Sequence, residues 1–187
     1  RPPRRTPWPR VAGSHVGTVV GPEGEEIYTD KHGRVQVVFK WDLDDSKKLD
    51  RSCWIRVAQP FAGQNFGAVF LPRIGHEVIV DFLDGDPDNP VVVGSLYNGA
   101  NLPPWKLPDN KTQSGLKSES TDGKGFPDLY NEIKFEDRKG QEVFSMQAQK
   151  DHVVLIKNKE TREIGPEYKD GGYSRETTLK QGNDKLD

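Results

Sequence analysis

Cysteine is almost absent from this chain of 187 residues, and the only one, Cys53, cannot form a disulfide within the chain. It lies in SCWIRVA, where polar and apolar residues alternate, so we predict that a strand buries it as a small apolar side chain. No apolar run approaches the roughly 20 residues of a membrane-spanning helix. The N-terminal stretch RPPRRTPWPR has no apolar segment after its arginines, which argues against a signal peptide.

Apolar residues are also scarce, at 33% of the chain, and the mean hydropathy is −0.80. Compact globular domains usually have a larger fraction of apolar residues, so we expect part of the chain to lack a core of its own. Charge is abundant but balanced, with 27 basic and 29 acidic residues and a net charge of −2. This balance argues against a general binder of polyanions.

Motifs for catalysis and metal binding are missing. The chain has no Gly-x-Ser-x-Gly, no phosphate-binding loop and no dinucleotide-binding glycine pattern. The histidines are widely spaced, which argues against a zinc site: His15, His32, His76 and His152. Adjacent acidic residues are expected by chance in so charged a chain, and no cleft is indicated that would hold them as a glycosidase requires: Glu25–Glu26, Asp44–Asp45 and Glu136–Asp137. We therefore predict a protein that is not an enzyme, with no catalytic, cofactor-binding or metal-binding residues.

The segment DGDPDNP places Asp84, Asp86 and Asp88 at alternate positions, as calcium-binding loops do. An EF-hand loop would also need glycine at its sixth position and glutamate at its twelfth, where this chain has Asn89 and Ser95. Asp, Asn, Gly and Pro each favour tight turns. We therefore predict a turn between two strands here and not a metal site.

Short segments with strand-like alternation or with unbroken apolar runs fill residues 16–100, and none of them has a helical pattern. They predict an all-β fold, an antiparallel barrel of the size of an OB fold. We expect glycines at the barrel corners: Gly75, Gly85 and Gly94. The expected core is mainly valine: Val35, Val37, Phe39, Ile55, Val57, Val78, Ile79, Val80 and Val92.

Three other regions flank the expected barrel. Residues 1–15 contain four prolines and are predicted to be an extended linker. Residues 101–128 are rich in Pro, Gly, Ser and Lys and are predicted to be a second linker, in which Trp105 packs onto a neighbouring element. Residues 129–187 form a third region, which begins with two or three strands and a hairpin turn at EDRKGQ. Propensity alone also allows a helix over residues 141–151.

The C-terminal region has apolar side chains without an evident core. In residues 153–156 valine, leucine and isoleucine point to both faces of an expected strand, and one chain can cover only one face. Residues 159–187 have five large apolar side chains among 29 residues, too few to offset the cost of ordering them. Three chains around an axis would pool these side chains, so we predict a homotrimer, although a dimer or an open fibre also fits the residues.

Four stretches together resemble one known family: DKHGRVQVVFKWD, SCWIRVAQPFAGQNFGAVFLPRIGHEVIVDFLDGDPDNPVVVGSLYN, LPPWKLPDNKTQSGLKS and NEIKFEDRKGQEVF. They are similar to the VgrG spike proteins of bacterial type VI secretion, which in turn are similar to the baseplate spikes of contractile phages. The resemblance covers residues 1–157. It implies an OB-fold barrel followed by the start of a trimeric, intertwined β-helix needle, within residues 129–187. Regular Val-Gly octads, which the phage needles have, are not evident here.

The resemblance also implies partners and a location. A spike is a structural, non-catalytic part of a contractile machine that punctures the envelope of a target cell and carries effectors. An N-terminal hub domain upstream of residue 1 would dock on the secreted tube protein. Other implied partners are a tip-capping protein and effector or adaptor proteins, and the target membrane would be contacted mechanically. The protein would assemble in the bacterial cytoplasm and then be delivered into the target cell, where it would contribute to virulence.

The alternative function is that of an OB-type binding module, which would recruit an effector or adaptor protein. Binding of nucleic acid or oligosaccharide is the weaker form of this alternative, with aromatic side chains as stacking platforms. Residues 16–100 contain 8 basic and 13 acidic residues, a net charge of −5, which would repel a polyphosphate. We therefore predict no nucleic-acid binding, and we expect Trp41 and Trp54 in a core or an interface.

Overall fold

The computed structural model describes residues 6–43, 52–121, 129–166 and 175–180. The chain divides into two compact units, Arg1–Gln149 and Lys150–Asp187. The first unit contains all the strands of the described residues and one short 3-10 helix, η1 (Leu83–Gly85). Among the described residues, no helix has the length and apolar character that crossing a membrane requires.

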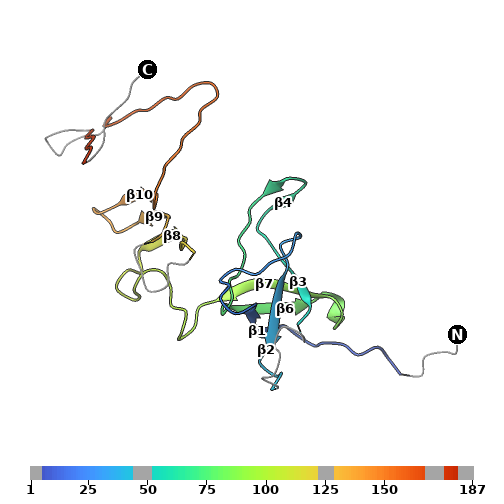
Figure 1. Cartoon of the computed structure of the whole chain (residues 1–187). Coiled ribbons are helices and arrows are strands. Elements are labelled where there is room, and N and C mark those ends of the chain that lie inside the picture. Colours follow the sequence, from blue (N-terminus) through green and yellow to red (C-terminus); the bar gives the residue numbers. More distant parts are fainter. Residues whose placement is uncertain (1–5, 44–51, 122–128, 167–174, 181–187) are drawn as a thin grey trace. The chain divides into compact units, whose positions relative to one another are not determined.

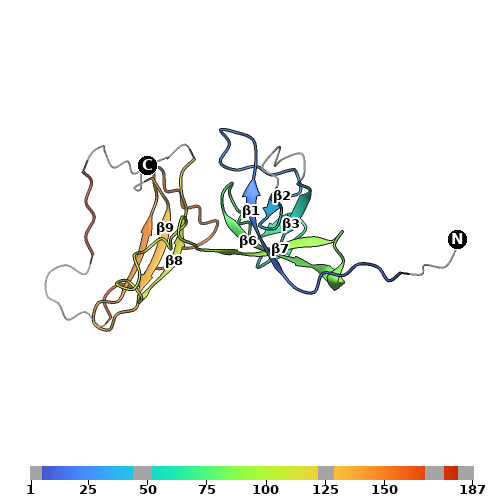
Figure 2. The same cartoon turned by 90° about the horizontal axis from the view of Figure 1, so that it is seen from below.

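A closed barrel of five strands occupies the first part of the chain (Figures 1 and 2). The strands follow one another around the barrel in the order β1-β2-β3-β7-β6, and β6 pairs with β1 to close it. Their bounds are β1 (His15–Val20), β2 (Val35–Phe39), β3 (Trp54–Val57), β6 (Glu77–Phe82) and β7 (Pro90–Leu96). The predicted OB-like barrel is confirmed, with one difference: β3 and β7 are parallel, whereas the other four pairs are antiparallel.

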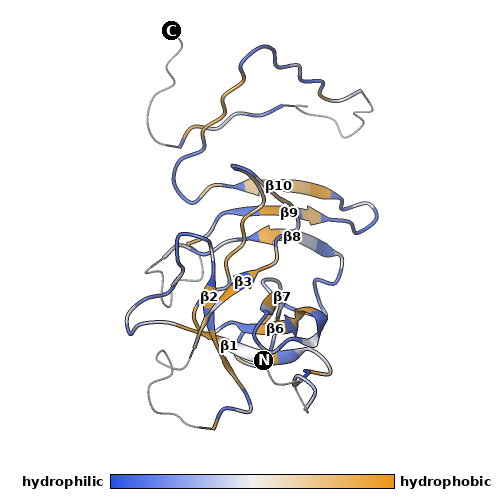
Figure 3. Ribbon diagram, turned by 90° about the vertical axis from the view of Figure 1, so that its right-hand side faces the viewer, coloured by the Kyte–Doolittle hydropathy of each residue, from blue (hydrophilic) through white to orange (hydrophobic). Residues whose placement is uncertain are grey.

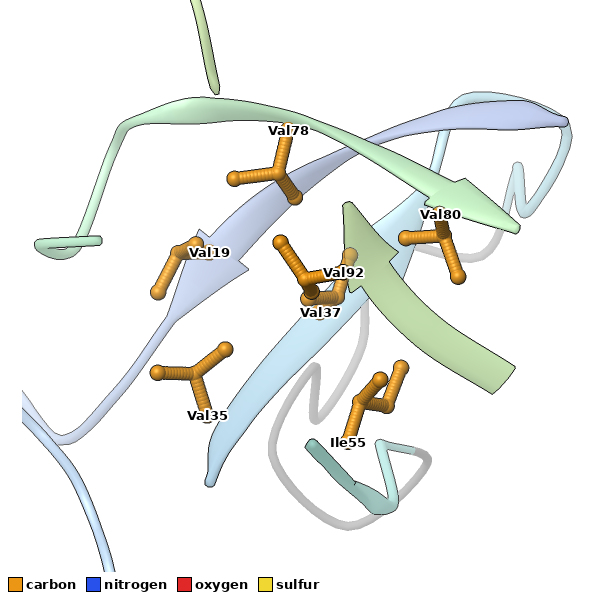
Figure 4. Packing of buried hydrophobic residues seen from close by; sticks show 7 residues of the cluster. All are labelled: Val19, Val35, Val37, Ile55, Val78, Val80 and Val92. Atoms are coloured by element: carbon orange, nitrogen blue, oxygen red, sulfur yellow. The ribbon is translucent and has the colours of Figure 1, made fainter. Parts of the chain in front are cut away.

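The barrel interior is filled almost entirely by valine. Figure 4 shows seven side chains from the five strands converging on one centre, and each is at most 3% exposed. Phe39, Val57 and Phe82 are partly buried and pack against them. The seven buried residues of this core are Val19, Val35, Val37, Ile55, Val78, Val80 and Val92.

Eight of the nine predicted core residues lie in or against this core, and the prediction for Ile79 is wrong. Successive side chains of a strand point to opposite faces, so Val78 and Val80 face the interior and Ile79 cannot. Val19 is 1% exposed and was not predicted. Its segment, HVGTVVG, shows alternation over too few residues to reveal which of its valines face inward.

The three predicted corner glycines have different roles. Gly75 and Gly85 have φ of +87° and +70°, and each ends a turn next to β6. Gly94 lies within β7, where it pairs with Ile79 beside a β-bulge between Ile79 and Val80, so it is not at a corner. A bulge bends and twists its strand locally, which helps short strands to close a barrel.

The turn between β6 and β7 is the predicted Asp/Gly/Pro turn. The Asp88 N–H donates to the Asp86 side chain over 3.0 Å, and the Asn89 N–H donates to the Asp86 carbonyl over 3.0 Å. The N-terminal segment lies against the same turn, because the Val11 N–H donates to the Gly85 carbonyl over 2.9 Å. A Cβ atom at Gly85 would lie 3.0 Å from the Val11 carbonyl oxygen, so glycine permits this close approach.

The prediction of a buried Cys53 is wrong, whereas of the two alternatives for Trp41 only the core is excluded, and an interface stays a prediction. Cys53 is exposed, because β3 begins at Trp54 and Cys53 precedes the regular alternation. Trp41 is not in the core: β2 ends at Phe39, and the Trp41 side chain is 63% exposed and stacks on Phe39. Trp54 is partly buried, with its ring 5.0 Å from that of Tyr28.

A short hairpin of β4 (Ala62–Gly63) and β5 (Phe66–Gly67) lies between β3 and β6 in the sequence. In Figure 1 it stands out from the barrel strands. The sequence analysis assigned no element to most of this segment; its strands have two residues each, and both are exposed. Asn65 at the turn has φ of +62°, which favours a tight reversal over a continuous strand.

A second sheet follows the barrel, with three antiparallel strands in the order β10-β9-β8. They are β8 (Gln113–Lys117), β9 (Glu132–Glu136) and β10 (Val143–Gln147). β8 lies within residues 101–128, which we expected to be a linker; its only large apolar residue is Leu116, so its order comes from pairing with β9. β10 is a strand and not a helix, and the predicted turn at EDRKGQ joins β9 to β10.

The second unit, Lys150–Asp187, has no helix or strand among its described residues. Every described residue of this unit is exposed, including Val153 and Leu155, which are 85% and 81% exposed. The strand that we expected at residues 153–156 is therefore not formed by one chain alone. Tyr168, Tyr173 and Leu186 lie outside the described residues.

Candidate assembly interface

The register of the three-stranded sheet gathers its apolar residues on one face. Phe135 of β9 lies opposite Phe144 of β10, and Ile133 lies opposite both Met146 of β10 and Leu116 of β8. Residues that are directly opposite each other on neighbouring antiparallel strands point to the same face. We call this set the apolar face of the sheet: Leu116, Ile133, Phe135, Phe144 and Met146.

The apolar face is open to solvent in one chain, with side chains between 38% and 61% exposed. The rings of Phe135 and Phe144 stack on each other, with centroids 5.1 Å apart and an angle of 19° between their planes. Figure 3 shows the apolar colouring along β8, β9 and β10. Soluble monomers rarely leave so contiguous an apolar patch uncovered, so this face is suited to bind another protein surface.

The opposite face of the same sheet is polar, and the chain itself covers part of it. Glu132 is only 9% exposed. Its carboxylate accepts a hydrogen bond of 2.9 Å from the indole N–H of Trp105 and lies 3.5 Å from the ammonium group of Lys134. On the same face, the Gln113 amide donates to Glu136 over 3.2 Å. These polar groups therefore have partners within one chain, and Val143, 55% exposed, is the one large apolar residue on this face of the sheet. The Trp105 packing that the sequence predicted is present.

A second group of uncovered apolar side chains follows in the second unit. Val153, Val154, Leu155 and Ile156 are between 43% and 85% exposed. The sequence analysis identified these four residues as needing cover from other chains. It missed the apolar face of the sheet, although the alternation in EIKFE and VFSMQ was available as a signal.

Arg73 joins the barrel to the segment that follows β8. Its guanidinium donates to the Glu119 carbonyl oxygen over 2.5 Å and lies 3.9 Å from the Glu119 carboxylate and 3.6 Å from that of Glu26. The His76 ring accepts a hydrogen bond from the Arg73 backbone N–H over 3.2 Å. Burial lowers the pKa of His76, and the nearby positive charge of Arg73 lowers it further. A neutral imidazole is the form that can accept this hydrogen bond.

The other residues considered from the sequence do not form a chemical site. In the part of the chain that the structure describes, no three His, Cys, Asp or Glu side chains come together in a way that would hold a metal ion. His15 accepts a hydrogen bond of 3.0 Å from the indole N–H of Trp41 and contacts the rings of Phe39 and Phe82. Asp44 and Asp45 lie outside the described residues.

Comparison with known families divides the chain where its architecture does. Residues 15–97 match the model of the type VI secretion system/phage-baseplate injector OB domain. Residues 114–184 match the model of the bacteriophage T4 gp5 C-terminal trimerisation domain. The first match covers the barrel. The second covers the sheet from Ser114 onward and most of the second unit, where the uncovered apolar residues lie.

Two named relatives agree with these two family matches. The chain is 50% identical over 165 residues to the type VI secretion system spike protein VgrG1b of Pseudomonas aeruginosa, which covers 88% of this chain and 22% of the relative. It is 48% identical over 158 residues to the actin cross-linking toxin VgrG1 of Vibrio cholerae, covering 84% of this chain and 14% of the relative. The chain thus spans less than a quarter of the length of these two relatives. With both domain matches in sequence order and identities near 50%, the chain belongs to the VgrG family of type VI secretion spike proteins.

Proposed function

We propose that this chain is the barrel and the trimerisation region of a homotrimeric spike that works in a contractile type VI secretion machine. The observation that carries the proposal is the apolar face of the β8–β10 sheet, which is exposed in one chain and lies within the matched trimerisation domain. Two further copies would cover it and would bring residues 153–156 together around a common axis. The barrel would form a rigid collar above this needle.

The role of the spike follows from the family. It would puncture the envelope of a target cell mechanically and deliver effectors, without being an enzyme itself. Its relatives support this, because several are named as spike proteins. The tube protein, a tip-capping protein, and effectors or adaptors are proposed as its partners. We also propose assembly in the bacterial cytoplasm before delivery into the target cell.

The domain boundaries of the sequence analysis enter the proposal with one change. Residues 1–15 would connect to an upstream hub domain and residues 16–100 would be the collar. The needle base would begin at β8 (Gln113–Lys117) and not at residue 129, because β8 pairs with β9 along its whole length. The OB-type binding module remains the alternative function, and no contact described above favours it.

Light scattering on the purified chain, combined with secretion by the full-length protein, tests the proposal. We expect a trimer for the chain and a monomer after Phe135→Asp and Phe144→Asp, because three copies would otherwise bury six unpaired carboxylates. The same two substitutions in the full-length protein should abolish export of the tube protein. Leu43→Asp is the matched control, since Leu43 is 90% exposed and lies outside the sheet. A monomeric wild-type chain with a folded, protease-resistant C-terminal region would overturn the proposal.

A further inference from the structure

Residues 57–72, with the sequence VAQPFAGQNFGAVFLP, contain no charged residue. Charged residues make up 30% of the whole chain, so a run of this length without one is unusual for it. Four large apolar side chains of this run are nevertheless exposed: Phe61 at 60%, Phe66 at 61%, Val69 at 72% and Phe70 at 56%. An exposed apolar surface of this size marks an interaction site, and the lack of charge excludes a partner that binds by ion pairs.

The exposed residues lie on an ordered projection. Phe61 precedes β4 and Phe66 is the first residue of β5, and their ring centroids are 5.5 Å apart. The Ala68 N–H donates to the Phe61 carbonyl over 2.9 Å. At the base, the Gln59 amide donates to the Phe70 carbonyl over 3.1 Å and accepts from the Phe70 N–H over 2.9 Å. The hairpin and these two phenylalanines, Phe61 and Phe66, form what we call the aromatic knob.

Beside the base of the knob, the barrel surface has an open groove of about 400 Å³ between the end of β3 and the middle of β7. No charged residue lines it. Val93, the residue that the β-bulge leaves unpaired in β7, is among its lining residues and is 48% exposed. The volume lies in the range of sites that hold organic groups, and the uncharged lining suits an aromatic side chain. The other apolar lining residues include Val57, Pro60, Phe70 and Pro72.

We propose that the aromatic knob of one protomer occupies the groove of the next protomer, so that three such contacts close a ring around the barrels. This inference rests on the trimer proposed above. Knob and groove are different surfaces of one chain, so contacts between them can run head to tail and close a ring of three. Both are uncharged, so their burial against each other leaves no unpaired charge. The trimer also supplies one knob for every groove.

The contact would give the trimer a second interface, separate from the apolar face of the sheet. It would hold the barrels together as a collar, whereas the sheet and the residues after it would hold the needle. An effector or adaptor protein with an apolar peptide is the competing occupant of the groove, and the experiment below distinguishes it from a second copy.

A designed disulfide tests the contact. Cys53→Ser removes the exposed native thiol, and Phe66→Cys with Val93→Cys then places one thiol on the knob and one in the groove. Because each knob meets the groove of a different protomer, mild oxidation should yield covalently closed trimers on a non-reducing gel. Either cysteine alone can yield at most dimers, which is the matched control. A trimer by light scattering whose double-cysteine variant stays monomeric on the gel would overturn the knob contact while leaving the spike proposal intact.

A second variant measures the contribution of the knob to assembly. Phe66→Asp should raise the concentration at which trimers dissociate at least tenfold, and Leu43→Asp should leave it unchanged. Unaltered assembly of Phe66→Asp would mean that the groove takes another protein, and would refute the inference. A wild-type chain that is monomeric at all concentrations would refute both this inference and the proposed trimer.

Discussion

The barrel and the C-terminal region contain the same types of apolar residue, but the barrel buries them and the C-terminal region leaves them exposed. Val78 and Val80 in the barrel are fully buried, whereas Val153 and Leu155 are 85% and 81% exposed. The barrel closes on itself, so each inward side chain meets others from neighbouring strands. The β8–β10 sheet is open and presents its apolar face to solvent. One region therefore covers its apolar side chains within a single chain, whereas we propose that the other needs further copies to cover them.

The largest effect is expected from charge in the second unit. Leu155→Asp with Ile156→Asp should convert the trimer to monomers, raising its dissociation constant at least a thousandfold, or about 4 kcal/mol. Six carboxylates would otherwise be buried without partners in the needle base. Sedimentation across a concentration series measures this effect. The barrel should keep its thermal transition, and loss of that transition would show that the two regions are not independent.

The next effect compares the stability lost on truncating a buried aliphatic residue of the barrel with that lost on truncating an exposed one of the second unit. Ile55→Ala in the barrel core should lower the free energy of unfolding by roughly 2–5 kcal/mol, because a cavity remains where the side chain was. Leu155→Ala removes a side chain of the same size in the second unit and should leave the barrel unchanged. Urea unfolding followed by tryptophan fluorescence compares the two variants. Equal losses in barrel stability would contradict the proposed difference.

A smaller and more local effect is expected at the first strand of the sheet. Gly115 has φ of +151°, and a Cβ atom there would lie closer than van der Waals contact to the Ile133 carbonyl oxygen. Gly115→Ala should therefore lower the stability of the β8–β10 sheet by roughly 1–3 kcal/mol and weaken the pairing of β8 with β9. Hydrogen exchange should show faster exchange in β8 and unchanged protection in β6. Gly99→Ala, where a Cβ atom would meet nothing within 4 Å, is the control.

A pH-dependent effect is expected in the loop between β1 and β2 of the barrel. Burial of the Asp30 carboxylate would raise its pKa, but hydrogen bonds from Arg34 and from the His32 N–H outweigh this and hold the pKa at about 2. A lowered pKa in the folded state stabilises the fold above the unfolded value of 3.8, and this contribution disappears as the pH falls towards 2. The wild-type chain should thus have a higher urea midpoint than Asp30→Asn at pH 7. The difference should shrink between pH 4 and pH 2, and a constant difference would exclude this role.

The smallest effect is an expected absence of binding. The net charge of −5 over residues 16–100 should prevent the barrel from holding single-stranded DNA, even at low salt. Fluorescence anisotropy with a labelled oligonucleotide measures it. Micromolar affinity with a steep dependence on salt would show that the OB-type binding module is the better description. The exposed Trp41, stacked on Phe39, would then be the first residue to test.

Sequence patterns identified the barrel well because its strands show either alternation, as in RVQVVF, or short unbroken apolar runs, as in PVVVG. The position of Val35 and Val37 followed directly from RVQVVF, and both are buried. The errors lie where alternation fails or stops: Ile79 occupies the outward position between two inward valines, and Cys53 precedes its strand. The apolar face of the sheet was missed because it depends on how β9 pairs with its two neighbours.

The sequence by itself determined the class of fold, the tight turn at residues 84–90 and the shortage of core after residue 150. These features follow from local chemistry: side-chain alternation, turn-forming residues and the ratio of apolar to charged residues. Only the tertiary structure decided the parallel pairing of β3 with β7, the contact of Arg73 with Glu119 and the side of the sheet that remains uncovered. Each of these depends on segments far apart in the chain, whose pairing is set by closure of the whole barrel and by strand register. No local pattern encodes that pairing.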